Sequence, residues 1–163
     1  MKPRRPVTPE AALIRMETLC SRSERSEGEI RAKLRNLGLS SAQADSIVKS
    51  LLDRRFIDDR RFAGVFARSK LIYSGYGRYR INPALRAKGV APDIIAEAID
   101  ALDSEAYNNK LEEIIERKAR SLPETSDYES RNKIYRYAAS RGFESDLIIA
   151  ALKRVLRRLN STP

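Results

Sequence analysis

The feature that most constrains the fold is a pattern that occurs three times along the chain. In each copy an isoleucine is followed eight residues later by a glycine, and another apolar residue comes next. The copies are offset by 51 and then 53 residues, and their matching positions are Ile30, Leu34, Gly38, Leu39 and Val48; Ile81, Leu85, Gly89, Val90 and Ile99; and Ile134, Ala138, Gly142, Phe143 and Leu152. A fixed period of this length is typical of repeat proteins in which each copy is one supersecondary unit.

The first copy predicts two amphipathic helices joined by a turn at Gly38. Ser26 and Glu29 have the spacing of a capping box, so a helix should begin there and run to about Leu37. Gly38 should end it, because glycine accepts the left-handed conformation common at helix ends. A second helix should begin near Ser40 or Ser41 and bury Ala44, Ile47, Val48 and Leu51.

The rest of the chain completes an all-α architecture. A Thr8–Pro9 start signal predicts a helix to about Arg22, and Asp58 or Asp59 should cap a helix with Phe62, Val65 and Phe66 on its apolar face. No segment shows the alternation of a strand. We predict three tandem three-helix, helix-turn-helix-like repeats at 9–57, 58–103 and 104–163, after a basic, disordered tail at 1–8. Residues 103–109 should form a polar joint.

Pro83 leaves two conformations open for the second copy. A helix that begins near Gly77 would contain Pro83 and lose a backbone hydrogen bond, which would kink it. Alternatively, the helix restarts with Asn82 as its cap and Pro83 at its first position.

Composition limits the classes of function. The chain has 32 Lys and Arg against 22 Asp and Glu, a net charge of +10, which predicts a negative partner such as nucleic acid or an acidic protein surface. A basic protein whose charge does nothing specific is the alternative.

The single cysteine and the lack of histidine exclude an internal disulfide and a Cys/His zinc site, and Cys20 should be a small buried side chain. No stretch resembles a membrane span or a secretory signal, so we expect a cytoplasmic protein.

The sequence contains no catalytic constellation, so we predict a binding protein without cofactors rather than an enzyme. Histidine is absent, and Gly75–Gly77 lacks the lysine and hydroxyl residue of a phosphate-binding loop. The acidic pairs 58–59 and 112–113 are adjacent, and adjacent residues on a helix point in different directions.

Positive charge instead lies on the first two helices of the copies. The loop at 73–80, YSGYGRYR, mixes tyrosines with arginines, which can stack on bases and bind phosphates or can pack a helix junction. The third helix of the second copy exposes Asp93, Glu97 and Asp100, which argues against sequence-specific reading of a DNA duplex by every copy.

Three segments carry a resemblance to a known family: SEGEIRAKLRNLGL at 26–39, DDRRFAGVFARSK at 58–70 and SGYGRYRINPALRAKGV at 74–90. In this order and spacing they resemble the RecX family of recombinase regulators. The resemblance implies an elongated, curved arrangement of three-helix repeats. It also implies binding to RecA and its filament on single-stranded DNA, in the SOS response and in DNA repair and recombination. There the protein would limit filament growth and inhibit strand exchange, ATP hydrolysis and co-protease activity.

The candidate contact residues come from the matched segments and from the basic helices around them. They are Arg31, Arg35, Arg61, Arg68, Tyr76, Arg78, Arg80, Arg86, Lys88, Lys133 and Arg136. Each could instead be solvated or serve packing. We expect a monomer that also binds DNA weakly. Whether it caps filament ends or coats the groove stays open, as does the alternative of a basic helical nucleic-acid-binding protein that acts without RecA.

Overall fold

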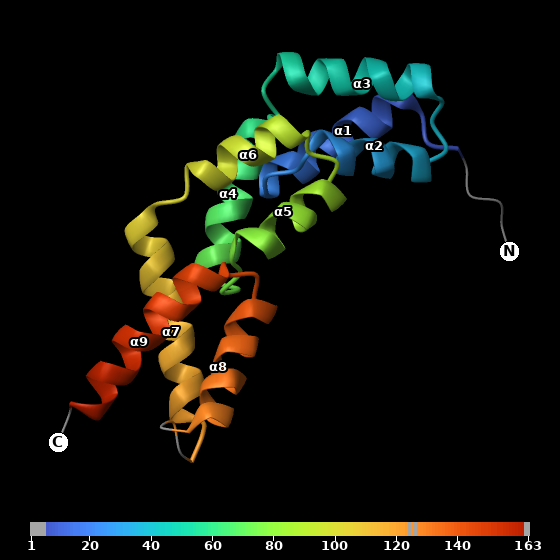
Figure 1. The fold of residues 1–163 in the computed structure, drawn as a ribbon. Helices are drawn as coiled ribbons and strands as arrows, with labels where there is room; N and C mark the ends of the chain where they lie inside the picture. Colours follow the sequence, from blue (N-terminus) through green and yellow to red (C-terminus); the bar gives the residue numbers. More distant parts are fainter. Residues whose placement is uncertain (1–5, 124, 126, 162–163) are drawn as a thin grey trace, which may run out of the picture. The chain divides into compact units, whose positions relative to one another are not determined.

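The computed structural model describes residues 6–123, 125 and 127–161, and these residues form helices and no strand (Figure 1). The helices are α1 (Pro9–Arg22), α2 (Glu27–Asn36), α3 (Ser41–Asp53), α4 (Asp59–Ile72), α5 (Arg78–Ala87), α6 (Pro92–Asp100), α7 (Ser104–Arg120), α8 (Tyr128–Ser140) and α9 (Ser145–Asn160). The prediction of an all-α fold built from tandem three-helix repeats is therefore confirmed. The repeat boundaries stay a prediction.

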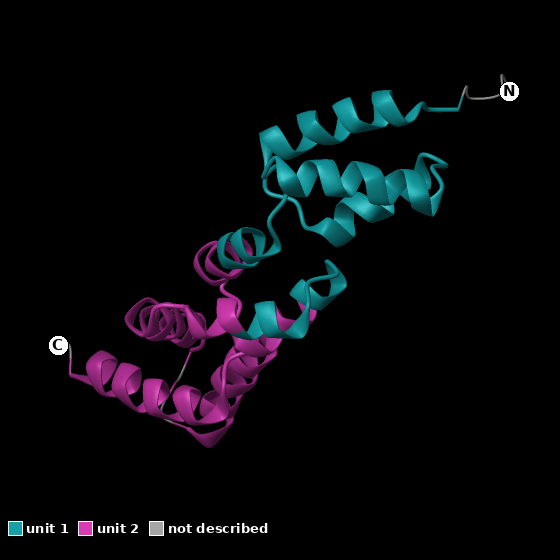
Figure 2. Cartoon of the chain, turned by 90° about the horizontal axis from the view of Figure 1, so that it is seen from above, with its two compact units in different colours: residues 1–65, 85–96 teal, residues 66–84, 97–163 magenta. Residues whose placement is uncertain are grey.

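The chain divides into two compact units, residues 1–65 with 85–96 and residues 66–84 with 97–163 (Figure 2). The division does not follow the repeats, because α4, α5 and α6 each contribute residues to both units. In the first unit α3 packs against α1 and α2, and in the second α7, α8 and α9 pack against one another.

The first repeat forms the elements that its sequence predicts. Thr8 caps α1 by accepting a hydrogen bond from the Ala11 N–H, and Ser26 and Glu29 form a reciprocal capping box at α2. Gly38 has a φ of +82°, the left-handed conformation expected after a helix. Of the predicted disordered tail, residues 1–5 lie outside the described residues, whereas Val7 packs against the core.

Three of the repeated positions are buried in all three copies. They are the isoleucine, the leucine or alanine four residues later, and the apolar residue that follows the turn glycine. The last repeat position differs: Val48 is 1% exposed and Ile99 9%, but Leu152 is only half-buried. The third repeat thus leaves uncovered a position that the other two bury.

The apolar face predicted for α4 is partly wrong. Asp58 caps the helix by accepting from the Arg61 N–H at 3.0 Å, and Phe62 is buried as expected. Val65, however, is 38% exposed, and the buried positions beside Phe62 are Ala63 and Ala67. Small side chains allow close packing here, and a search for large apolar residues overlooks them.

The predicted joint at 103–109 is helical. Asp103 accepts a hydrogen bond from the Ala106 N–H at 2.7 Å and so caps α7, which begins at Ser104. Tyr107, in the first turns, is 1% exposed and lies one helical turn before the buried Leu111. The polar residues that suggested a loop are the solvent face of the helix.

α5 runs from Arg78 to Ala87 with Pro83 inside it, so the alternative in which the helix restarts at Asn82 is wrong. Proline removes one backbone donor, but the fully buried Ile81 and Leu85 anchor the helix on either side of it. Pro83 cannot donate a hydrogen bond to the carbonyl oxygen of Tyr79, four residues earlier. Both residues are exposed, so this part of the helix faces solvent.

Each unit joins the start of a helix to the turn of the following repeat. In the first unit the Ser26 hydroxyl donates to the carbonyl oxygen of Lys88 at 2.6 Å. In the second unit the Gly77 N–H donates to the carbonyl oxygen of Arg141 at 2.9 Å. Ser26 and Gly77 are the same repeat position, and so are Lys88 and Arg141, which precede the turn glycines. We call these two contacts the repeat junctions.

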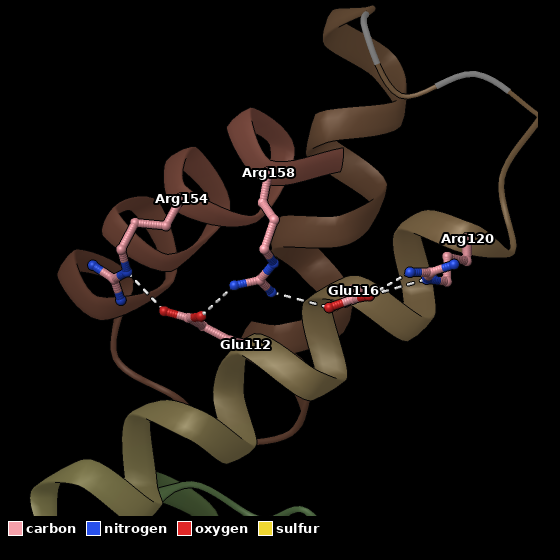
Figure 3. A network of polar contacts seen from close by, with 5 residues as sticks. All are labelled: Glu112, Glu116, Arg120, Arg154 and Arg158. Carbon is pink, nitrogen blue, oxygen red and sulfur yellow. Dashed lines mark hydrogen bonds and ion pairs between the residues drawn. The ribbon is translucent and has the colours of Figure 1, made fainter. Parts of the chain in front are cut away.

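An ion-pair network joins α7 to α9 in the second unit (Figure 3). Glu112 accepts from Arg154 at 2.7 Å and from Arg158 at 3.2 Å, and Glu116 accepts from Arg158 at 3.0 Å and from Arg120 at 2.6 Å. Partial burial alone would raise the pKa of Glu112, but the hydrogen bonds from Arg154 and Arg158 outweigh it and lower that pKa.

Candidate partner-binding site

The site is built on the segment between α4 and α5. Gly75 has a φ of +63°, and its N–H donates to the Leu71 carbonyl oxygen at 3.1 Å. The Tyr76 N–H then donates to the Lys70 carbonyl oxygen at 2.9 Å. These bonds turn the chain sharply after α4, and a side chain at position 75 would be strained because L-residues disfavour positive φ. The turn fixes the position of Tyr76.

Three cationic side chains surround the ring of Tyr76. The Arg80 Cζ lies 4.1 Å from the ring centroid, the Arg141 Cζ 5.3 Å and the Lys70 Nζ 5.6 Å. Cations at these distances are attracted by the ring's quadrupole, which holds them together despite their mutual repulsion. We call Lys70, Tyr76, Arg80 and Arg141 the Tyr76 cluster.

The Tyr76 cluster has no carboxylate within ion-pair distance in the part of the chain that the structure describes. Arg80 donates to the Ser140 carbonyl oxygen at 3.4 Å, and Arg141 donates to the carbonyl oxygens of Ser74 and Gly75. Neutral carbonyls orient the two guanidinium groups without cancelling their charge. An anionic group beside the cluster would gain charge-assisted hydrogen bonds and would relieve the repulsion between the cations.

A second network, of hydrogen bonds and one ion pair, fixes the start of α5. The Tyr107 hydroxyl donates to Glu144 at 2.6 Å and accepts from the Arg78 N–H at 3.0 Å. The Arg78 side chain pairs with Glu144 at 2.9 Å and lies over the Tyr107 ring, its Cζ 3.9 Å from the centroid. Burial, reinforced by the bond to Glu144, raises the pKa of Tyr107 well above its usual range, so the hydroxyl keeps its proton.

Five predicted contact residues pair with carboxylates of the chain itself. Arg31 pairs with Glu27 and Asp45, Arg61 with Glu24, Arg78 with Glu144, Lys88 with Glu29, and Lys133 with Glu129. A partner that used these cations would have to compete with those carboxylates. The pairs of Arg61, Arg78 and Lys88 join different repeats, which favours a role in holding the repeats together. Arg31 and Lys133 pair within their own repeat.

The other predicted residues have exposed or half-buried side chains. Four of them are exposed and make no ion pair among the residues described: Arg35, Arg68, Arg86 and Arg136. Tyr76 and Arg80 are brought together in the Tyr76 cluster. Arg35 and Arg86 belong to the first unit, and the others to the second.

Two members of the cluster escaped the sequence prediction. Neither Lys70 nor Arg141 is among the candidate contact residues that the sequence indicated. A signal for Arg141 was present, because it precedes the turn glycine just as Lys88 does in the second copy. Comparing the copies position by position would have found it. Tyr107 and Glu144 have no such signal, because their pairing depends on how helices distant in sequence pack.

The described residues include no group of three or more His, Cys, Asp or Glu side chains that could hold a metal ion. Cys20 is a free thiol that packs against the core of the first unit, but it is half-buried where a buried side chain was predicted. Burial raises the pKa of this thiol. No helix in the described ranges has the length and apolarity needed to cross a membrane.

The fold and the Tyr76 cluster together define a basic all-α protein of tandem three-helix repeats that carries a group of cationic side chains. Residues 58–99 match the second three-helix domain of RecX, and residues 105–152 match the third. "Regulatory protein RecX" of Haemophilus influenzae is 33% identical over 129 residues, which are 78% of this chain and 84% of that protein. Its counterpart in Chlorobium phaeobacteroides is 30% identical over 141 residues, 85% of this chain and 89% of that protein. The chain belongs to the RecX family of regulatory proteins.

Solved structures have the same fold. The crystal structure of RecX from Lactobacillus salivarius superposes with a TM-score of 0.84 at 22% identity and covers 91% of this chain and 97% of that one. A second structure, of regulatory protein RecX, superposes with a TM-score of 0.75 at 23% identity. The match covers 90% of this chain and 71% of that one. At these identities the likeness establishes the fold alone.

The relatives differ in length. This chain spans 64% of the length of "Regulatory protein RecX" from Clostridium botulinum (strain Eklund 17B / Type B), to which it is 30% identical over 137 residues.

Proposed function

We propose that this chain binds RecA and its nucleoprotein filament and inhibits filament growth, strand exchange, ATP hydrolysis and co-protease activity. It acts by binding, as a cytoplasmic monomer without a cofactor. Family membership supports a regulatory role, and the resemblance of segments 26–39, 58–70 and 74–90 supplies RecA as the partner. The observation that carries the proposal is the Tyr76 cluster, whose three cations lack carboxylate partners in the described residues.

A filament suits a protein of this kind because both are repetitive. The filament offers phosphates of single-stranded DNA and carboxylates of RecA at regular intervals. The cluster can accept either anion, since guanidinium groups form strong hydrogen bonds to phosphate and to carboxylate. The exposed Arg68 and Arg136 of the same unit add charge that steers a negative partner.

The test is the DNA-dependent ATPase of RecA, measured while this protein is added from far below stoichiometry up to one copy per RecA. Inhibition far below stoichiometry is expected if filament ends are capped, and inhibition near stoichiometry if the groove is coated. Unchanged ATPase and strand exchange would overturn the proposal. If salt-sensitive binding to naked DNA persisted in that case, a nucleic-acid-binding protein that acts without RecA would be the better description.

A matched pair of variants tests the site. Lys70→Ala with Arg80→Ala should raise the concentration for half-inhibition about tenfold, the equivalent of roughly 1.4 kcal/mol of binding free energy. Arg117→Ala with Arg120→Ala removes the same charge from α7, where both arginines pair with glutamates, and should change it little. Equal effects from the two double variants would show that net charge acts rather than the cluster.

A further inference from the structure

A groove of about 360 Å³ lies between α8 and α9, away from the residues of the Tyr76 cluster. Its apolar lining comes from Ile149, Leu152 and Leu156 of α9. Its basic lining comes from Arg131 of α8 and from Lys153 and Arg157 of α9. The groove therefore combines an apolar half, formed by the three aliphatic side chains, with a basic half, formed by the three cations.

Two of the three apolar lining residues, Ile149 and Leu152, expose more apolar side chain than their counterparts in the other repeats, whereas Leu156 is buried. Leu152 is half-buried where the matching Val48 and Ile99 are buried. Ile149 is 49% exposed, and the first two copies place Asp45 and Ala96 at that repeat position. The third repeat thus carries additional apolar surface at two positions where the others need none, which suits a surface that a partner covers.

The basic half is set apart from the ion pairs on the same helix. Arg154 and Arg158 pair with Glu112 and Glu116 of α7 (Figure 3). Lys153 and Arg157 each precede one of those arginines, so they point about 100° away around the helix. Neither they nor Arg131 has a carboxylate within ion-pair distance in the described parts of the chain. One side of α9 is neutralised and the groove side is not.

We propose that this groove is the docking site for an acidic amphipathic helix of a partner protein. Apolar side chains of such a helix would cover Ile149 and Leu152, and its glutamates or aspartates would meet Lys153, Arg157 and Arg131. Helix-in-groove recognition uses apolar residues at i, i+3, i+4 and i+7, which suits a groove whose apolar lining lies along one helix. A nucleic acid fits less well, because phosphates gain nothing from contact with isoleucine and leucine. The proposal is independent of RecA binding and of the Tyr76 cluster.

The test is direct binding, by fluorescence anisotropy, of a labelled synthetic peptide to the full chain. The peptide has leucine at i, i+3, i+4 and i+7 and glutamate on its other face, and a scrambled peptide has the same composition without the apolar stripe. The amphipathic peptide should bind at least about tenfold more tightly than the scrambled one. Equal affinities would overturn the proposal, as they would show attraction by charge alone.

Matched variants locate the site. Lys153→Ala with Arg157→Ala, and separately Ile149→Ser, should each weaken peptide binding about tenfold. Arg154→Ala with Arg158→Ala removes the same charge from the same helix, and it should change the affinity for the peptide by no more than about twofold. Equal weakening by both double variants would overturn the proposal.

A measurement on the unsubstituted protein does not depend on how variants fold. The methyl resonance of Ile149 should shift on addition of the amphipathic peptide and not on addition of oligo-dT. A shift with oligo-dT alone would assign the groove to nucleic acid and overturn the proposal. Absence of any shift at Ile149 would overturn it as well.

Discussion

Ser26 donates its hydroxyl hydrogen bond to the carbonyl oxygen of Lys88, a residue 62 positions later in the chain. The same hydroxyl accepts the Glu29 N–H at 3.1 Å, and Glu29 in turn pairs with the Lys88 ammonium at 2.7 Å. A helix cap is thereby also the joint between the first repeat and the turn of the second. The junction of Gly77 and Arg141 uses a backbone N–H at the same repeat position.

The glycines at the junctions should not tolerate alanine. A Cβ at Gly28 would lie 2.5 Å from the Lys88 carbonyl oxygen, and a Cβ at Gly77 would lie 2.4 Å from the Gly142 carbonyl oxygen. Alanine normally stabilises a helix by about 0.5–1 kcal/mol relative to glycine. Here we expect Gly28→Ala to lower the free energy of unfolding, by roughly 1–3 kcal/mol, because backbone atoms must move apart. Urea unfolding followed by circular dichroism measures it.

Gly38 provides the control for that experiment. A Cβ there would meet nothing within 4 Å, so Gly38→Ala should cost only the strain of its positive φ, about 1–2 kcal/mol. Gly38→Asn should recover part of this loss, since asparagine tolerates that conformation, whereas Gly28→Asn should not improve on Gly28→Ala. A stabilising Gly28→Ala would contradict the junction geometry.

Acid should weaken the first junction. Burial opposes ionisation of Glu29, but bonds from Lys88 and the Ser26 backbone prevail and lower its pKa below the ordinary 4.5. A carboxylate with a lowered folded-state pKa adds stability above its unfolded-state pKa and loses it as the pH falls through the folded-state value. Glu29→Gln should therefore destabilise the protein at about pH 7 and do so by a smaller amount near pH 3, below the ordinary pKa of 4.5. An effect of equal size at both pH values would count against this assignment.

The hydroxyl of Tyr107 should contribute to stability in addition to the packing of its ring. Tyr107→Phe keeps the ring against Phe143, whose centroid is 5.1 Å away, but it removes one of the hydrogen bonds to Glu144 and leaves the Arg78 N–H without its acceptor. We expect a loss of about 1–3 kcal/mol in unfolding free energy. The exposed Tyr128 offers a matched control, and Tyr128→Phe should be nearly neutral. Similar values for the two variants would disprove the role of the network.

The ion pairs between α7 and α9 should respond to salt. Arg158 joins Glu112 to Glu116, so Arg158→Ala should lower the melting temperature in dilute buffer. The difference should shrink near 1 M salt, where the screening length is only about 3 Å. Arg157→Ala removes a neighbouring cation that has no carboxylate within ion-pair distance in the described residues, and it should not lower the melting temperature. A salt-independent loss in Arg158→Ala would indicate packing instead.

Most of the helical fold could be predicted because it depends on local patterns. Capping boxes, turn glycines and apolar spacing act within a few residues, and they placed α1, α2 and α3 correctly. The errors at Val65 and at residues 104–109 arose where packing chose between small and large side chains or where a polar helix face resembled a loop.

The site was less predictable because charge pairing is a tertiary property. Sequence alone marked Arg78 and Arg80 as equivalent basic residues. The structure places Arg78 on Glu144, 66 residues away, and Arg80 on the ring of Tyr76. Which arginine keeps its charge available depends on which distant carboxylates reach it, and no local pattern records that.

The repeat junctions also affect how such a protein can diverge. A backbone carbonyl oxygen accepts the hydrogen bond in both contacts, and every amino acid supplies that group. Substitutions elsewhere on a repeat can therefore remodel its charge and shape without loosening the joint, provided that the glycines at 28 and 77 stay. The surface of each repeat is therefore free to adapt to a different partner, while the connection between repeats can stay as it is.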